Sequence, residues 1–166
     1  LPPEVDQPIG TREGDEGDEF AFQVTANKEE LFYQWDFGDG ETKNGRNLDS
    51  VSHVYKADNV YSVTVTVTDA DLEEAKSEVL QVTVMNAPPI AKPGGPYTGK
   101  EGGKIKFDAS ESVDPGADPL TYQWEFDGET KEGKIVTFDL KTVGTSTATL
   151  RVTDDAGGSS DGEANV

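Results

Sequence analysis

One stretch of this sequence occurs twice, and the repeat constrains the fold more than any other feature. "YQWDFGDGETKNG" at residues 33–45 returns as "YQWEFDGETKEG" at residues 122–133. A shift of 85 residues also aligns residues 3–22 with residues 88–107. Self-similarity at a fixed period is typical of a chain built from copies of one structural unit. The sequence therefore predicts two homologous domains.

The two copies differ mainly where turns are expected. The second copy inserts four residues before its "YQW", deletes one in the turn that follows, and drops three from the next loop. Turns tolerate such changes better than strands do. We place the domains at residues 1–85 and 86–166, with the boundary in "MNAPPIAKP", whose prolines are incompatible with a central strand.

Alternating apolar and polar residues predict that each copy is made of β-strands. In "YSVTVTVTD" at residues 61–69, one tyrosine and three valines alternate with one serine and three threonines, which predicts a single buried face. Turns rich in Gly, Asp, Asn and Pro separate at least five such segments per copy. Short, evenly spaced strands are typical of a sandwich. We therefore predict an all-β chain of two tandem Ig-like antiparallel β-sandwiches.

Two tryptophans are expected to fill the cores of these sandwiches. Burying an indole removes about 150–250 Å² from water, so Trp35 and Trp124 would dominate the packing between sheets. The Asp and Gly residues after each tryptophan would form a tight turn. The alternation places five further side chains on buried faces: Phe20, Phe22, Val24, Ile105 and Phe107.

Charge and composition exclude several classes of function. The formal net charge of −19 disfavours binding to nucleic acid and to anionic membranes, and attracts cations. The absence of cysteine excludes disulfides and a thiolate nucleophile. No window approaches the roughly 18 consecutive apolar residues of a membrane span, so we expect no membrane insertion. No basic and apolar leader is visible in residues 1–10.

The linked motifs resemble those of the polycystic kidney disease (PKD) domain family. That family is characterised by a WDFGDG turn, a His-x-Tyr, a Tyr-x-Val alternation and a closing Val-x-Asp. The first copy matches at these positions: Trp35, Asp36, Phe37, Gly38, Asp39, Gly40, His53, Tyr55, Tyr61, Val63 and Asp69. The second copy departs from the pattern, because its turn is one residue short and Phe138 and Leu140 replace His53 and Tyr55. The resemblance covers the whole chain.

The resemblance also implies a calcium site in the second domain, next to the linker. Calcium-binding members use an Asn before Ala-Pro, an Asp in a Ser-x-Asp loop and the Asp that closes the Val-x-Asp strand. The matching residues here are Asn86, Asp114 and Asp154, with Asp118 and Asp155 nearby. Calcium prefers six to eight such oxygen ligands. The alternative is that these acidic residues are solvated turn residues.

The first copy lacks this set and retains only Asp69, so we expect one calcium ion. His53 is the only histidine, and Ser52 lies on the opposite face of its predicted strand, which disfavours a catalytic pair. The resemblance makes His53 a structural residue whose ring hydrogen-bonds a turn. Neither a triad nor a cofactor motif is present, and we expect no enzyme activity in these residues.

Two functions remain open. The first is a structural or adhesive spacer, a calcium-stiffened and monomeric module of a larger extracellular or cell-surface protein. The second is a substrate-binding accessory of a secreted hydrolase, with a polysaccharide or fibrous protein as partner. The second function requires exposed aromatic platforms, for which Tyr33, Tyr97 and Tyr122 are the candidates.

Overall fold

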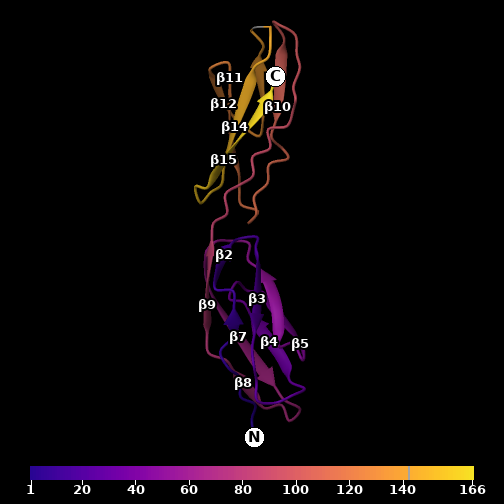
Figure 1. Ribbon diagram of the computed structural model, residues 1–166, viewed down its shortest axis with the longest axis vertical. Helices are drawn as coiled ribbons and strands as arrows, with labels where there is room; N and C mark the ends of the chain where they lie inside the picture. The colour runs from indigo at the N-terminus through magenta and orange to yellow at the C-terminus, as the bar shows by residue number, and fades with distance from the viewer. Residues whose placement is uncertain (142) are drawn as a thin grey trace. The chain divides into compact units, whose positions relative to one another are not determined.

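The computed structural model describes residues 1–141 and 143–166, which form two compact units, Leu1–Asn86 and Ala87–Val166 (Figure 1). The described residues contain fifteen strands and no helix, and hence no helix long and apolar enough to cross a membrane. The all-β prediction is confirmed. Each unit is described below by itself.

The first unit is a sandwich of two sheets. One sheet has the strand order β1-β3-β6, and the other has the order β2-β9-β7-β4-β5, with β8 paired to β7. The strands are β1 (Ile9–Gly10), β2 (Glu13–Asp15), β3 (Glu19–Gln23), β4 (Phe32–Asp36), β5 (Thr42–Arg46), β6 (Ser50–Val54), β7 (Asn59–Thr68), β8 (Glu74–Lys76) and β9 (Leu80–Met85).

The second unit repeats this plan with fewer strands. A two-stranded sheet, β10-β13, is accompanied by a four-stranded sheet with the order β12-β11-β14-β15. Its strands are β10 (Lys104–Asp108), β11 (Thr121–Phe126), β12 (Glu129–Glu132), β13 (Ile135–Asp139), β14 (Thr147–Thr153) and β15 (Ser159–Asn165).

The period-two pattern gives the strands that line the core one buried face, as predicted. In β7, Val63, Val65 and Val67 are fully buried, because successive side chains of a strand point to opposite faces. The five residues expected on buried faces of β3, β10 and their continuations are all at most 5% exposed. The buried faces of the two sheets in each unit supply its hydrophobic core.

Both tryptophans are fully buried between the sheets of their own unit. Trp35 on β4 faces Phe22 on β3, with ring centroids 6.5 Å apart. Trp124 on β11 stacks on Phe107 of β10 at 5.2 Å. Indole and phenyl rings from facing sheets therefore hold each sandwich together, and the predicted role of the tryptophans is confirmed.

One strand pair departs from the predicted antiparallel order. β2 pairs with β9 in parallel, with Glu13 opposite Thr83 and Asp15 opposite Met85. The chain reaches this edge before crossing to the other sheet as β3. Alternation within a strand does not carry the direction of its neighbour, so the sequence could not predict this pairing.

The turn after β4 requires glycine at one position. Gly38 has a φ of 85°, and a Cβ there would lie 2.8 Å from the backbone nitrogen of Ser62. Only glycine tolerates both this backbone conformation and so close a contact. The turn is thus held against the start of β7.

Candidate functional site

Asp114 lies in a loop of the second unit whose shape is set by its own carboxylate. Its Oδ1 accepts hydrogen bonds from the backbone N–H of Gly116 at 2.8 Å and of Asp118 at 3.2 Å. The other oxygen, Oδ2, is buried and makes no hydrogen bond with any residue that the structure describes. A buried carboxylate oxygen normally has a partner, so this atom is unusual.

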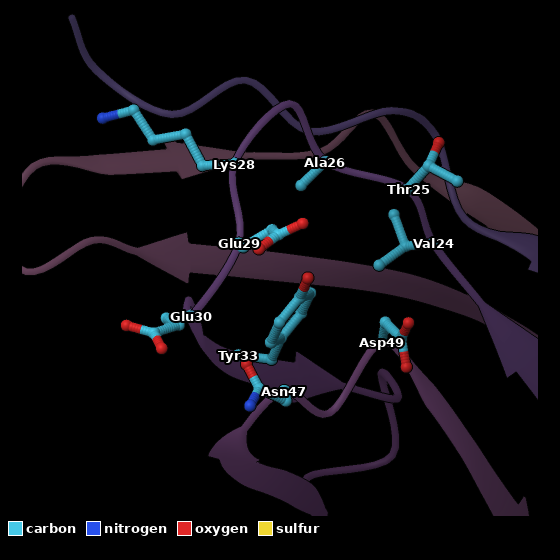
Figure 2. A pocket seen from close by; sticks show the side chains of 9 residues that line it. All are labelled: Val24, Thr25, Ala26, Lys28, Glu29, Glu30, Tyr33, Asn47 and Asp49. Carbon is cyan, nitrogen blue, oxygen red and sulfur yellow. The ribbon is translucent and has the colours of Figure 1, made fainter.

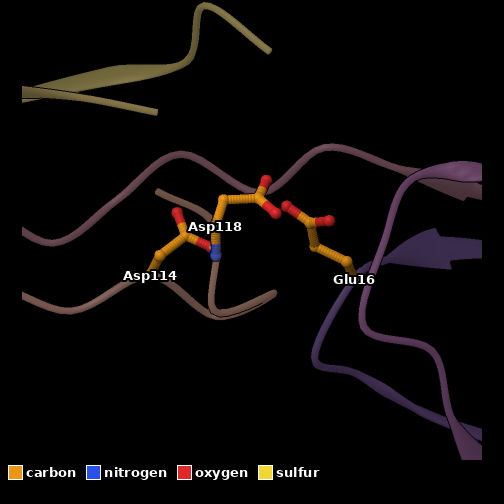
Figure 3. A group of neighbouring side chains, drawn as sticks. All are labelled: Glu16, Asp114 and Asp118. Carbon is orange, nitrogen blue, oxygen red and sulfur yellow. The ribbon is translucent and has the colours of Figure 1, made fainter. Parts of the chain in front are cut away.

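Asp118 belongs to the same loop and points its carboxylate toward the same region (Figure 3). One carboxylate oxygen of Asp114 and one of Asp118 lie within 4.8 Å of each other. Two carboxylates at this separation repel each other unless a cation or a proton lies near them. The loop is therefore suited to binding a cation.

Asp154 closes the strand β14 in a tight turn. Its backbone N–H donates to the carbonyl of Gly158 at 3.0 Å, and its Oδ1 accepts from the N–H of Gly158 at 2.7 Å. The side chain is 5% exposed. Thr153 pairs with Thr121, which places Asp154 at the end of the sheet where β11 leaves the 114–118 loop.

Two of the three predicted calcium ligands, Asp114 and Asp154, belong to the second unit, but Asp114, Asp118 and Asp154 do not all place carboxylate oxygens within 4.8 Å of one another. The third, Asn86, is the last residue of the first unit and directly precedes Ala87. Of the two nearby residues, Asp118 joins the loop of Asp114, whereas the side chain of Asp155 is exposed.

In the first unit, the counterpart of Asp154 has a lysine as its partner. Asp69 closes β7 with the same turn, since its Oδ1 accepts from the N–H of Glu73 at 3.0 Å and its own N–H donates to the carbonyl of Glu73. Its Oδ2 binds the Lys28 ammonium at 2.5 Å. This hydrogen bond is the main cause that lowers the pKa of Asp69 below its usual value.

His53 has the structural role that the resemblance implies. Its Nε2 lies 2.6 Å from Oδ2 of Asp39 in the turn after β4, and its ring stacks on Phe37 with centroids 4.1 Å apart. Tyr55 donates its hydroxyl hydrogen bond to the carbonyl of Phe37 at 3.0 Å. Burial is the main cause that raises the pKa of Tyr55, and nearby Asp39 adds to it. Imidazole and phenol therefore anchor this turn to β6.

The three tyrosines proposed as binding platforms differ in what they present. Tyr33 is only 6% exposed. Tyr97 packs edge-on against Phe107 at 4.9 Å, and its hydroxyl donates to the carbonyl of Pro93 and accepts from the N–H of Asp108. Tyr122 is half-buried, with the Lys134 ammonium 5.8 Å from its ring centroid. Tyr33 and Tyr97 therefore do not serve as exposed stacking surfaces.

Both units have the architecture of an Ig-like sandwich module, and a family match makes the class more specific. The model of the PKD domain matches residues 1–84 and again residues 86–166. The chain belongs to the PKD domain family and consists of two tandem PKD domains. PKD domains are generally non-catalytic modules and typically occur in extracellular proteins.

Several solved structures are similar to this chain. The PKD domain of an M14-like peptidase from the Thermoplasmatales archaeon SCGC AB-540-F20 is 23% identical, with a TM-score of 0.42, over 51% of this chain and 96% of that chain. The fibronectin(III)-like modules of Clostridium thermocellum CbhA are 14% identical over 98% of this chain and 92% of that chain, with a TM-score of 0.42. An amphioxus IgVJ-C2 molecule is 14% identical over 93% of this chain and 98% of that chain, with a TM-score of 0.47.

Proposed function

We propose that this chain is a non-catalytic spacer module of an extracellular or cell-surface protein, and that calcium stiffens its second domain. Asp114 and Asp154 would hold the ion, with Asn86 as the third residue that the family resemblance implies. Bound calcium would neutralise the carboxylates and tie the 114–118 loop to the end of β14. The remaining ligands would come from backbone carbonyls, Asp118 and water.

The observation that supports calcium most strongly is the buried Oδ2 of Asp114, which makes no hydrogen bond with a described residue. A carboxylate oxygen removed from water without a partner destabilises the fold by several kcal/mol or becomes protonated. A hard divalent cation would supply that missing partner. The chain's net charge of −19 would further favour cation binding at low ionic strength.

Isothermal titration calorimetry of the 166-residue chain with calcium chloride tests this proposal. We expect one binding event, which Asp114→Ala and Asp154→Ala each abolish. The matched control is Glu163→Ala, because Glu163 is an exposed acid on β15 of the same domain. Saturating calcium, at about 100 times the Kd, would stabilise the second domain by about 2.7 kcal/mol. Absence of heat in the parent chain, or the same isotherm in both site variants, contradicts the proposal.

A substrate-binding module is the second candidate, and Tyr122 is the residue that favours it. This half-buried ring lines an open concavity of about 750 Å³ together with Lys134 and Arg151. Aromatic rings beside hydrogen-bonding groups suit a polysaccharide or a fibrous protein. Retention of the chain on chitin, cellulose or collagen, and its loss in Tyr122→Ala, would support this function over a spacer.

A further inference from the structure

The first domain contains a pocket of about 520 Å³ that the calcium proposal does not involve. Three segments surround it: the chain after β3, the start of β4, and the turn between β5 and β6 (Figure 2). A pocket of this size accommodates a small organic group. The residues that decide its chemistry are Lys28, Glu29, Glu30, Tyr33, Asn47 and Asp49.

Tyr33 has a buried ring whose hydroxyl group faces this pocket. Its ring is packed into the core, and only 6% of the residue is exposed. Figure 2 shows its hydroxyl pointing into the space beneath Glu29 and beside Asp49. None of the described residues forms a hydrogen bond with this hydroxyl. Because the oxygen faces the pocket and has no partner in the part of the chain that the structure describes, it is available to a ligand.

The charges around the hydroxyl are negative. Glu29, Glu30 and Asp49 are exposed acids that line the pocket. The one lysine of the lining, Lys28, has its ammonium 2.5 Å from Asp69 and directed away from Tyr33 in Figure 2. Burial raises the pKa of Tyr33, and the negative charge of Asp49 raises it further. The pocket thus has a negative potential where its free hydroxyl lies.

We propose that this pocket binds an organic cation, namely a guanidinium or primary ammonium group of the kind carried by arginine and lysine side chains. Such groups donate hydrogen bonds and accept none, while the Tyr33 oxygen, the Asn47 carbonyl and the Asp49 carboxylate all accept them. The planar guanidinium with five N–H donors matches several acceptors at once. The tyrosine oxygen would anchor the cation at the base of the pocket, and the acids would attract it.

The spacing of the acids favours a polyatomic cation over a bare metal ion. Among the described residues, Glu29, Glu30 and Asp49 do not bring their carboxylate oxygens within 4.8 Å of one another. A divalent ion requires its oxygens to converge within a single coordination sphere. A guanidinium, which extends over several ångströms, reaches acceptors that are farther apart.

The second domain provides an internal control for this site. The wall of the pocket formed by Asn47 and Asp49 belongs to the turn between β5 and β6. In the second copy only Lys134 lies between Gly133 and Ile135, whereas the first copy has residues 46–49 between Gly45 and Ser50, so Asn47 and Asp49 have no counterpart. The cation site is therefore specific to the first domain.

Nuclear magnetic resonance titration of the 166-residue chain with agmatine, a small guanidine, tests the proposal. We expect amide shifts at the pocket, around Thr25 and Asn47, and none in the second domain. A blocked Gly-Arg-Gly peptide tests whether a peptide arginine is bound as well as a free guanidine. N-acetylglucosamine serves as the neutral ligand and should cause no shift.

Two variants test the named contacts. Tyr33→Phe keeps the buried ring and removes only the hydroxyl, and Asp49→Asn removes only the charge; each should weaken agmatine binding about fivefold. Glu19→Gln is the matched control, since this exposed acid begins β3 at the end remote from the pocket, and it should leave binding unchanged.

Two results would overturn the proposal. The first is an absence of agmatine shifts at the pocket, or shifts that persist equally in both variants. The second is a stronger response to N-acetylglucosamine than to agmatine, which would assign the pocket to a neutral ligand. Asp49 is exposed, so Asp49→Asn preserves the test even if Tyr33→Phe does not fold.

Discussion

The two domains close the same turn with the same residue but surround it differently. Asp69 after β7 and Asp154 after β14 both bind the backbone of the residue four positions later. In the first domain the carboxylate of Asp69 also holds the ammonium of Lys28. In the second, the loop before β11 is four residues longer and carries Asp114 and Asp118. The comparison shows that the same backbone turn can lie beside a lysine of the chain, as in the first domain, or in a domain whose neighbouring loop carries further acidic residues, as in the second.

A second difference concerns the residue that packs against the turn after each tryptophan, which is His53 in the first domain and Phe138 in the second. His53 stands opposite Phe20, and Phe138 stands opposite Ile105, so the two residues occupy equivalent positions. The histidine binds Asp39 of the longer turn. Phe138 instead packs against Phe126 at 5.7 Å. Where the turn is one residue shorter, an apolar contact replaces the polar one.

The tryptophans themselves differ in a single hydrogen bond. Nε1 of Trp35 donates to the carbonyl of Leu48 at 2.8 Å, whereas Nε1 of Trp124 is buried without a partner among the described residues. Leu48 belongs to residues 46–49 between Gly45 and Ser50, whereas only Lys134 lies between the matching Gly133 and Ile135 of the second domain. The deletion therefore removes both the acceptor of the indole and a wall of the cation pocket.

The largest effect is expected when the histidine of the first domain is placed in the second. Phe138→His should destabilise the second domain by about 2–4 kcal/mol, because an apolar ring is lost and a buried imidazole lacks a partner. Native-state hydrogen exchange at the amides of Leu150 and Val65 reads the stability of the two domains separately. Only the exchange of Leu150 should accelerate.

The reciprocal variant, His53→Phe, serves as its comparison. It removes the partner of Asp39, whose side chain is 17% exposed and can be partly rehydrated. We expect a smaller loss of about 1–2 kcal/mol, seen at Val65 and not at Leu150. If Phe138→His were the milder of the two changes, the acid–imidazole contact would not explain the difference between the domains.

An intermediate effect is expected from replacing each tryptophan with phenylalanine. Both changes leave a similar cavity, but Trp35→Phe also removes a hydrogen bond, while Trp124→Phe removes a buried N–H that has no acceptor. We expect Trp35→Phe to be the more destabilising by about 1–2 kcal/mol. Native-state hydrogen exchange at the amides of Val65, for Trp35→Phe, and Leu150, for Trp124→Phe, measures both values. Equal losses would mean that the Leu48 contact contributes nothing.

The smallest effect is expected at the lysine pair of the first domain. The pKa of Asp69 is lowered in the folded state, so its contribution to stability is present above the unfolded value of about 3.9. This contribution is lost as the pH falls through the folded value. Lys28→Met should remove it, and the stability difference between parent and variant should therefore shrink toward low pH.

Unfolding measured at a series of pH values tests whether the stability difference shrinks toward low pH. Carboxylate titration by carbon NMR measures the pKa of Asp69 directly. The pKa of Asp69 should rise in Lys28→Met. Lys56→Met is the matched control, because Lys56 approaches Glu41 only at 3.8 Å and both side chains are well exposed. An unchanged Asp69 titration would show that Lys28 does not hold this carboxylate in solution.

Much of the fold could be predicted because its signals are local. The alternation in β7 determines which side chains are buried, and the repeated "YQW" identifies the core strand of each domain. The contact between Lys28 and Asp69 could not be predicted in the same way, since 41 residues separate them and Lys28 belongs to no recognisable motif. The unpartnered hydroxyl of Tyr33 was also missed, because alternation predicts burial of a ring but not the surroundings of its oxygen.

Because of the Lys28–Asp69 contact, the turn of the first domain needs no dissolved counterion. A dissolved counterion is lost on dilution and removed by a chelator, whereas a counterion joined to the same polypeptide keeps a constant effective concentration beside the acid. Dilution or a chelator should therefore leave the carboxylate of Asp69 neutralised.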